Sequence, residues 1–245
     1  MQLSILNMKQ FEFEYIYKTQ KGFGWHNEDA WGINEKYPIY AVADGVTLRG
    51  LSELFHPSGS KPAADIFCEC AVKTFEKNYA KLSKKAFRDA YSSANKEIGR
   101  YIAKNKLNIS AVAALVAVRN GKIFGSRLTD CGFALIRGGK IIFKTPEYWS
   151  WAKKNKIKGY GVLDGKAKNL KYIDFYELAY APGDILALFT DGFENHFSKK
   201  GFIASFKNKN FNNIEESIKT VDLKLVAKNP EKFGHERTLL IVQLT

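Results

Sequence analysis

The chain has 245 residues, of which 45% are apolar and 26% are charged, an ordinary composition for a globular protein. The three cysteines fit neither a disulfide framework nor a zinc site, and no segment reaches the roughly 20 apolar residues that cross a bilayer. The N-terminus lacks the basic start and apolar run of a signal peptide. We therefore expect a soluble, cytoplasmic monomer, without a membrane partner, that forms one domain over residues 1–245.

The first third of the chain predicts two strands and two helices. Alternating apolar residues predict an edge or half-buried strand over residues 11–17. A short apolar run predicts a buried strand over residues 39–43 that ends at Asp44. Apolar residues at three- and four-residue spacing follow Pro62, a favourable first-turn residue, and predict a helix. A second apolar stripe follows Ser83, which we expect to cap its helix.

The middle of the chain predicts a series of short strands. These apolar segments lie at residues 110–118, 122–127, 133–137 and 140–144. Asn120-Gly121 and Gly138-Gly139 are typical of tight hairpin turns. Because parallel strands need long crossovers, we predict an antiparallel meander.

The last third adds a loop, strands and a helix. Residues 145–170 have little apolar periodicity and are interpreted as a long surface loop, and residues 184–189 predict another buried strand. A late helix is predicted with Asn212 or Asn213 as its cap, before a final strand over residues 237–244. Antiparallel strands with separate helices predict an α+β layered sandwich.

Acidic residues are the candidate chemical groups of this sequence. Two apolar strands end at Asp-Gly, at Asp44 and at Asp191, although this pair alone is usually an ordinary turn. Further acids that lie near strand ends are Glu28, Asp29, Asp130 and Glu236. Converging carboxylates suit magnesium or manganese rather than zinc. Two such ions could activate a water for attack on phosphorus, so no serine or cysteine nucleophile is required.

Five segments resemble successive motifs of one enzyme family and follow its order along the chain. They are GFGWHNEDAWGI, AVADGVTLRG, SRLTDCGFALIRGGKI, LAYAPGDILALFTDGFEN and GHERTLLIVQL. The chain resembles the type 2C metal-dependent serine/threonine protein phosphatases, in their compact microbial form. The resemblance implies a four-layer α-β-β-α sandwich of two antiparallel sheets flanked by helices. It also implies hydrolysis of phosphoserine and phosphothreonine in proteins by a metal-bound hydroxide, with two Mn2+ or Mg2+ ions and an optional third.

The resemblance also implies roles for individual residues. Asp44 would bridge two metals, and Gly45 would donate its carbonyl oxygen. Glu28 would hold a metal-bound water, with Asp29 close behind it, and Asp191 would bind the first metal. Asp44, Asp191 and Glu28 are therefore the expected catalytic residues.

Two of the family's metal-binding motifs are altered in this chain. Thr129-Asp130-Cys131-Gly132 stands where the family has Gly-Asp-Ser-Arg, and Asp130 would join Asp191 in the optional third site. The family's late aspartate, a ligand of the first metal, is replaced by His235, which is followed by Glu236. Either residue could complete the first metal site, since a neutral imidazole also binds manganese.

The expected phosphate-binding arginine is missing. The family has it four residues before the glutamate, and that position is Gly24 here. Lys21, His26 or Arg49 could take its place, although each of these is more often a plain surface residue.

Three functions compete on this evidence. The first is an active phosphatase whose net charge of +13 favours acidic phosphorylated proteins. The second is a pseudophosphatase that binds a phosphoprotein or a regulatory partner with weak turnover or none. The third is a nucleic-acid-binding module, but the ordered acidic motifs and the lack of a recognition motif argue against a nucleic-acid partner. The lysine run at residues 153–158 is interpreted as a solvated face.

Overall fold

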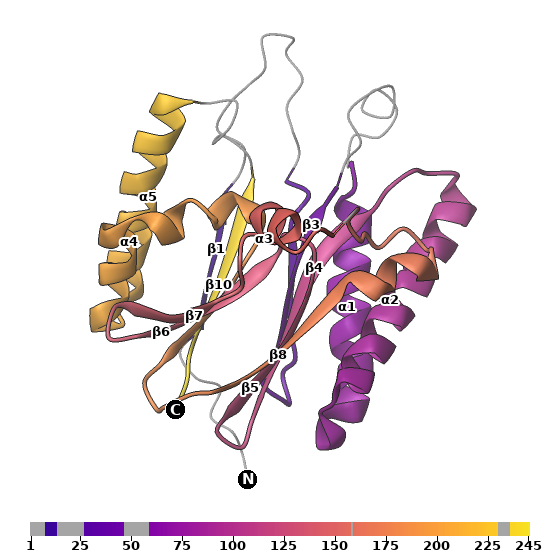
Figure 1. Cartoon of the computed structure of the whole chain (residues 1–245), viewed down its shortest axis with the longest axis horizontal. Helices are drawn as coiled ribbons and strands as arrows, with labels where there is room; N and C mark the ends of the chain where they lie inside the picture. Colours follow the sequence, from indigo (N-terminus) through magenta and orange to yellow (C-terminus); the bar gives the residue numbers. More distant parts are fainter. Residues whose placement is uncertain (1–7, 14–26, 47–58, 158, 230–235) are drawn as a thin grey trace.

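Two antiparallel sheets face each other and helices cover their outer faces, which confirms the predicted four-layer α-β-β-α sandwich (Figure 1). The computed structural model describes residues 8–13, 27–46, 59–157, 159–229 and 236–245, and for 8–13 the backbone alone. One sheet has the order β1 (Met8–Phe13), β10 (Arg237–Gln243), β9 (Ile185–Phe189), β6 (Gly132–Arg137) and β7 (Lys140–Lys144). The other has the order β2 (Ala30–Ile33), β3 (Ile39–Gly45), β4 (Ala111–Arg119), β5 (Lys122–Leu128) and β8 (Ile173–Ala179).

Apart from a short helix over residues 148–154, the α-helices lie in two groups on opposite sides of the sheets (Figure 1). The α-helices are α1 (Lys61–Asn78), α2 (Lys84–Asn105), α3 (Tyr148–Lys154), α4 (Lys200–Ser205) and α5 (Phe211–Lys228). Short 3-10 helices lie at η2 (Tyr79–Lys81), η3 (Ala167–Tyr172), η4 (Asp191–Phe193), η5 (His196–Ser198) and η6 (Phe206–Asn208). Helices α1 and α2 pack on the sheet that contains β3, and α4 and α5 pack on the sheet that contains β9. In the described part of the chain, no helix has the length and apolar character needed to cross a membrane.

The core consists of three apolar layers, one between the sheets and one under each pair of helices. Strand β3 shows how the sequence produces them. Ile39 and Ala41 face α1 and α2, whereas Tyr40 and Val42 face the opposite sheet. Because successive side chains of a strand point to opposite faces, a strand that is covered on both faces reads as one continuous apolar run.

The sequence predicted one hairpin turn and the cap of α2 correctly, and it predicted the cap of α5 wrongly. Asn120 and Gly121 both have positive φ (50° and 73°), as a type I′ hairpin turn requires. Ser83 caps α2 by accepting a hydrogen bond from the backbone amide of Ala86 at 3.2 Å. The predicted cap of α5 was wrong, because the cap is Asn210, whose side chain accepts from the backbone amide of Asn212.

The predicted meander is divided between the two sheets. Strand β5 pairs with β8 and β6 pairs with β9, so β5 and β6 are not partners. The chain crosses from one sheet to the other at Thr129, whose φ is +67° and whose hydroxyl donates to the carbonyl of Gly161. Hairpin signals specify only which strands pair locally. The choice of sheet depends on burying both faces of each strand, which is a tertiary requirement.

Two other predicted segments differ in detail. Residues 145–170, interpreted as a surface loop, contain α3 and the start of η3. The carboxylate of Glu147 caps α3 by accepting from the backbone amides of Trp149 and Ser150 at 3.0 and 2.8 Å. The strand predicted over residues 11–17 overlaps β1, and residues 14–17 lie outside the described part of the chain.

Candidate metal centre

Four segments that carry acidic residues meet at one end of the sandwich, the upper end in Figure 1. Strand β3 ends just after Asp44, and β9 ends two residues before Asp191. Strand β6 begins two residues after Asp130, and β10 begins directly after Glu236. Because β9 is antiparallel to both β6 and β10, its last residues lie beside the first residues of those strands.

The carboxylates affect one another electrostatically. Burial raises the pKa of Asp44 well above its ordinary value, and the charges of Asp191 and Asp29 raise it further. Burial also raises the pKa of Asp130 to about 7, with Asp191 adding to the effect. The pKa of Asp29 is raised to about 8, again first by burial, with Glu236 contributing. The site thus concentrates negative charge that a cation would offset.

Asp29 is held by a hydrogen-bond relay that joins the two sheets. The hydroxyl of Thr190 donates to Oδ2 of Asp29 at 2.8 Å and accepts from the backbone amide of Thr238 at 2.9 Å. The other oxygen, Oδ1 of Asp29, is buried and has no hydrogen-bond partner among the described residues, and the same holds for Oδ1 of Asp130. A bound cation would satisfy such oxygens.

The N-terminus of α1 positions Glu28 and Gly45. Oε1 of Glu28 accepts from the backbone amide of Ser60, the helix cap, at 2.8 Å, and the amide of Gly45 donates to the carbonyl of Glu28 at 3.2 Å. A Cβ on Gly45 would lie only 2.8 Å from the carbonyl carbon of Ser60 and 2.9 Å from Cβ of Glu28. Glycine is therefore required where the end of β3 meets α1.

A buried charge network, which the sequence analysis missed, lies beneath Asp191 and Glu236. Asp222 of α5 pairs with Nη2 of Arg237 at 3.0 Å and with Nε2 of His196 at 2.7 Å. Burial lowers the pKa of His196, so the guanidinium of Arg237 is the charge that balances Asp222. The only sequence signal was the position of Asp222 on the apolar stripe of α5, four residues after Ile218.

This network holds in place two of the segments that carry acids, those of Asp191 and Glu236. His196 follows Asp191 in the chain, and Arg237 follows Glu236. A Cβ on Gly192 would lie 2.6 Å from Cβ of Arg237, so the two segments are in direct contact.

The carboxylate oxygens at this end of the sheets are the kind of donor atom that a hard divalent cation prefers. They do not form a closed ligand shell. No group of three or more His, Cys, Asp or Glu side chains is placed to hold a metal ion within the described ranges. The fit rests on the oxygen-only donors and on the two buried, unpartnered carboxylate oxygens. Asp44 is half-buried and Asp191 is exposed, so the site opens to solvent. The remaining predicted residues, Lys21, His26, Arg49 and His235, lie outside the described part of the chain.

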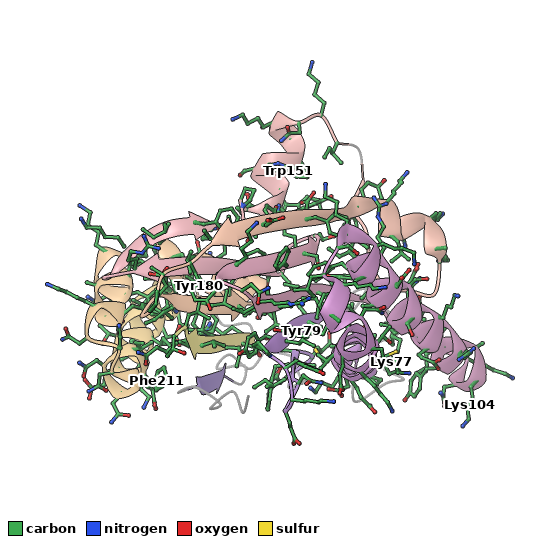
Figure 2. All side chains as sticks on the ribbon, turned by 90° about the horizontal axis from the view of Figure 1, so that it is seen from below. Lys77, Tyr79, Lys104, Trp151, Tyr180 and Phe211 are labelled. Carbon is green, nitrogen blue, oxygen red and sulfur yellow. The ribbon has the colours of Figure 1, made fainter. Side chains whose placement is uncertain are left out.

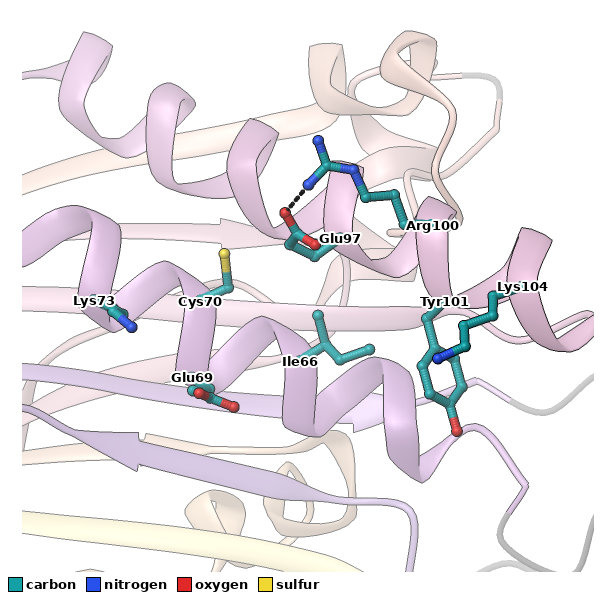
Figure 3. Close-up of a pocket in the computed structure, with 8 residues that line it drawn as sticks. All are labelled: Ile66, Glu69, Cys70, Lys73, Glu97, Arg100, Tyr101 and Lys104. Atoms are coloured by element: carbon teal, nitrogen blue, oxygen red, sulfur yellow. Dashed lines mark hydrogen bonds and ion pairs between the residues drawn. The ribbon is translucent and has the colours of Figure 1, made fainter.

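A groove of about 480 Å³ lies away from these acids, between α1 and α2 (Figure 3). Cys70 of α1 lines it, together with Glu97 and Arg100 of α2, which form an ion pair. None of the acids at the sheet ends lines this groove, so we do not assign it to the chemistry.

Two antiparallel sheets between helices, with acids at one end of the sheets, are the architecture of the protein phosphatase 2C fold. The sequence profile described as protein phosphatase 2C matches residues 21–227, and the chain belongs to this family. This confirms the family resemblance drawn from the motifs. A search of curated proteins finds no significant match.

Solved structures show the same fold at low sequence identity. The catalytic domain of the serine/threonine phosphatase PstP, in complex with two manganese ions, is 12% identical, with a TM-score of 0.66 and 98% of each chain covered. PstP/Ppp of Mycobacterium tuberculosis is 13% identical, with a TM-score of 0.68 and 98% of each chain covered. PppA of Pseudomonas aeruginosa, a regulatory component of T6SS, is 16% identical, with a TM-score of 0.67 and 99% of each chain covered.

Proposed function

We propose that this chain is a metal-dependent protein phosphatase that hydrolyses phosphoserine and phosphothreonine in proteins, using Mn2+ or Mg2+. The observation that carries the proposal is the convergence of Asp44, Asp130, Asp191 and Glu236 at one end of a protein phosphatase 2C sandwich. Two buried carboxylate oxygens without hydrogen-bond partners among the described residues support a cation at this place. The manganese ions in the PstP structure support the same class of metal.

We assign the metal ligands by the family pattern. Asp44, the carbonyl of Gly45 and Asp191, with His235 or Glu236, would hold two ions. Asp130 with Asp191 would hold an optional third ion. When bound, such ions lower the pKa of water and neutralise phosphoryl oxygens.

The chain's own residues orient this set. Ser60 fixes Glu28 through the cap of α1, and Thr190 fixes Asp29 through the relay between the sheets. Because Oδ2 of Asp29 accepts this hydrogen bond, its second oxygen, Oδ1, is left to face the cations.

The test is hydrolysis of an aryl phosphate and of a phosphothreonine peptide in Mn2+, Mg2+ or EDTA. The double variant Asp44→Asn/Asp191→Asn removes the two central charges. Asp89→Asn, a half-buried residue of α2 that pairs with exposed Lys85 away from the sheet ends, serves as the control. We expect turnover that depends on the metal, persists in the control and disappears in the double variant. Folded wild-type protein without turnover in any metal would refute the enzymatic proposal.

A pseudophosphatase is the second candidate. It is favoured by the absence, among the described residues, of a three-residue group that is ready to hold a metal, and by Gly24 at the family's arginine position. Under this alternative, the protein binds a phosphoprotein or a regulatory partner without turnover. Phosphopeptide binding by a protein that is inactive in every metal would support it.

A further inference from the structure

The connection between β7 and β8 is unusually basic. Residues 148–172, which we call the lysine arm, contain seven lysines and one aspartate in 25 residues, a net charge of +6 out of the chain's +13. Nearly half of the excess positive charge therefore lies in about a tenth of the sequence. Among the described lysines of the arm, only Lys166 forms an ion pair, with Asp164 at 3.0 Å. Within the described ranges, the other lysines of the arm form no ion pair with a carboxylate.

The arm contacts segments of the candidate metal centre near its start and at its middle. At its start, Glu147 lies close enough to Asp130 to raise its pKa. Further along the arm, the carbonyl of Gly161 accepts a hydrogen bond from the hydroxyl of Thr129. Leu163 exchanges two backbone hydrogen bonds with Ala111, at 2.8 and 3.1 Å. Ala111 is in turn the strand partner of Gly45. A protein bound to the arm would thus lie next to the acids.

A buried arginine anchors the inner side of the arm. The side chain of Arg127 is 1% exposed, pairs with Asp174 at 3.2 Å and donates to the carbonyl of Pro146. Its guanidinium also lies 5.9 Å from the ring centre of Tyr148 and 5.7 Å from that of Trp151. Figure 2 shows α3, which carries Trp151, standing out from the sheets. Helix α3, the first part of the arm, is therefore a projection of the fold that Arg127 holds in place.

The outer side of the arm presents aromatic rings and positive charge together. Trp149 and Tyr160 are 54% and 42% exposed, and their ring centres lie 5.6 Å apart in an edge-to-face contact. The lysines Lys153, Lys154 and Lys156 of the same segment are exposed. Exposed aromatic residues and cations are typical of surfaces that bind another protein, and unpaired lysines attract carboxylates and phosphates.

We propose that the lysine arm is a docking surface for an acidic segment of the phosphoprotein substrate, so that this enzyme favours phosphorylated residues with Asp and Glu nearby. The inference deepens the proposed function and rests on it. A polyanion such as nucleic acid would satisfy the charge alone. The acidic protein segment is favoured because Gly161 and Leu163 join the arm to the segments that carry Asp130 and Asp44.

The experiment compares two phosphothreonine peptides that differ only in their flanks, one rich in Asp and Glu and one rich in Lys. The arm variant is Lys153→Glu/Lys154→Glu/Lys156→Glu. The control variant, Lys200→Glu/Lys224→Glu/Lys228→Glu, changes the net charge equally on exposed positions of α4 and α5. An aryl phosphate without flanks reports the chemistry alone.

We expect wild type and the control variant to prefer the acidic peptide. The arm variant should lose about tenfold or more in kcat/KM for that peptide relative to the aryl phosphate, and the loss should shrink at high salt. Equal kcat/KM for the two peptides in wild type, or equal losses in both variants, would overturn the inference and leave the phosphatase proposal standing.

A binding measurement tests the docking surface even if the protein proves to have no phosphatase activity. If no substrate is hydrolysed, fluorescence anisotropy of the labelled acidic phosphopeptide still measures its Kd, and weaker binding by the arm variant than by the control variant supports docking. Tighter binding of a single-stranded oligonucleotide than of the acidic peptide, lost in the arm variant, would instead assign the arm to nucleic acid and overturn the inference.

Discussion

Replacing Asp29 by asparagine should stabilise the protein when no metal is present. Burial and the neighbouring acids raise the pKa of Asp29 from 3.8 to about 8. A carboxyl group whose pKa is raised on folding contributes stability that is fully present below pH 3.8 and is lost as the pH rises to about 8. At about 1.4 kcal/mol per pH unit, the loss between pH 3.8 and pH 7 reaches about 4 kcal/mol. Asparagine keeps an oxygen for the hydroxyl of Thr190 and removes the charge.

Urea denaturation in EDTA at pH 5 and at pH 8 measures the effect. We expect Asp29→Asn to exceed wild type in its free energy of unfolding by a few kcal/mol at pH 8 and by less at pH 5. Mn2+ should then stabilise wild type more than the variant, because the variant has lost a charge that faces the cation. Asp89→Asn, which removes only the pair with exposed Lys85 on α2, should change each value by less than about 1 kcal/mol. Equal or lower stability of Asp29→Asn at pH 8 in EDTA would contradict the electrostatic reasoning.

Three further predictions follow from contacts around the site. Gly45→Ala should weaken Mn2+ binding by calorimetry and lower the stability by about 1–3 kcal/mol, since its Cβ meets backbone, whereas Gly201→Ala has open space and should be neutral or stabilising. Asp222→Asn leaves the guanidinium of Arg237 without its partner charge and should cost about 3 kcal/mol in urea denaturation; a loss below about 1 kcal/mol would argue against the buried network. Arg127→Ala should expose the lysine arm to limited proteolysis before the rest of the chain, and unchanged cleavage would show that the arm is held by other contacts.

Much of the local structure could be predicted because its causes are local. Positive φ at Asn120-Gly121 and the cap at Ser83 follow from the residues themselves. The cap of α5 was misplaced because three asparagines, Asn210, Asn212 and Asn213, lie close together, and the cap is chosen by where α5 packs. Residues 145–170 lacked apolar periodicity because α3 is short and buries only Tyr148 and Ala152, beside the guanidinium of Arg127.

The sequence by itself determined the family, the two layers of strands with their helices, and the acids that lie at strand ends. Only the tertiary structure decided that β5 and β6 belong to different sheets and that Asp222 ties Arg237 to His196. The physical reason is the range of the forces concerned. Hydrophobic periodicity and turn geometry act over a few residues, whereas burial of both faces of a strand and pairing of buried charges join residues that lie far apart in the chain.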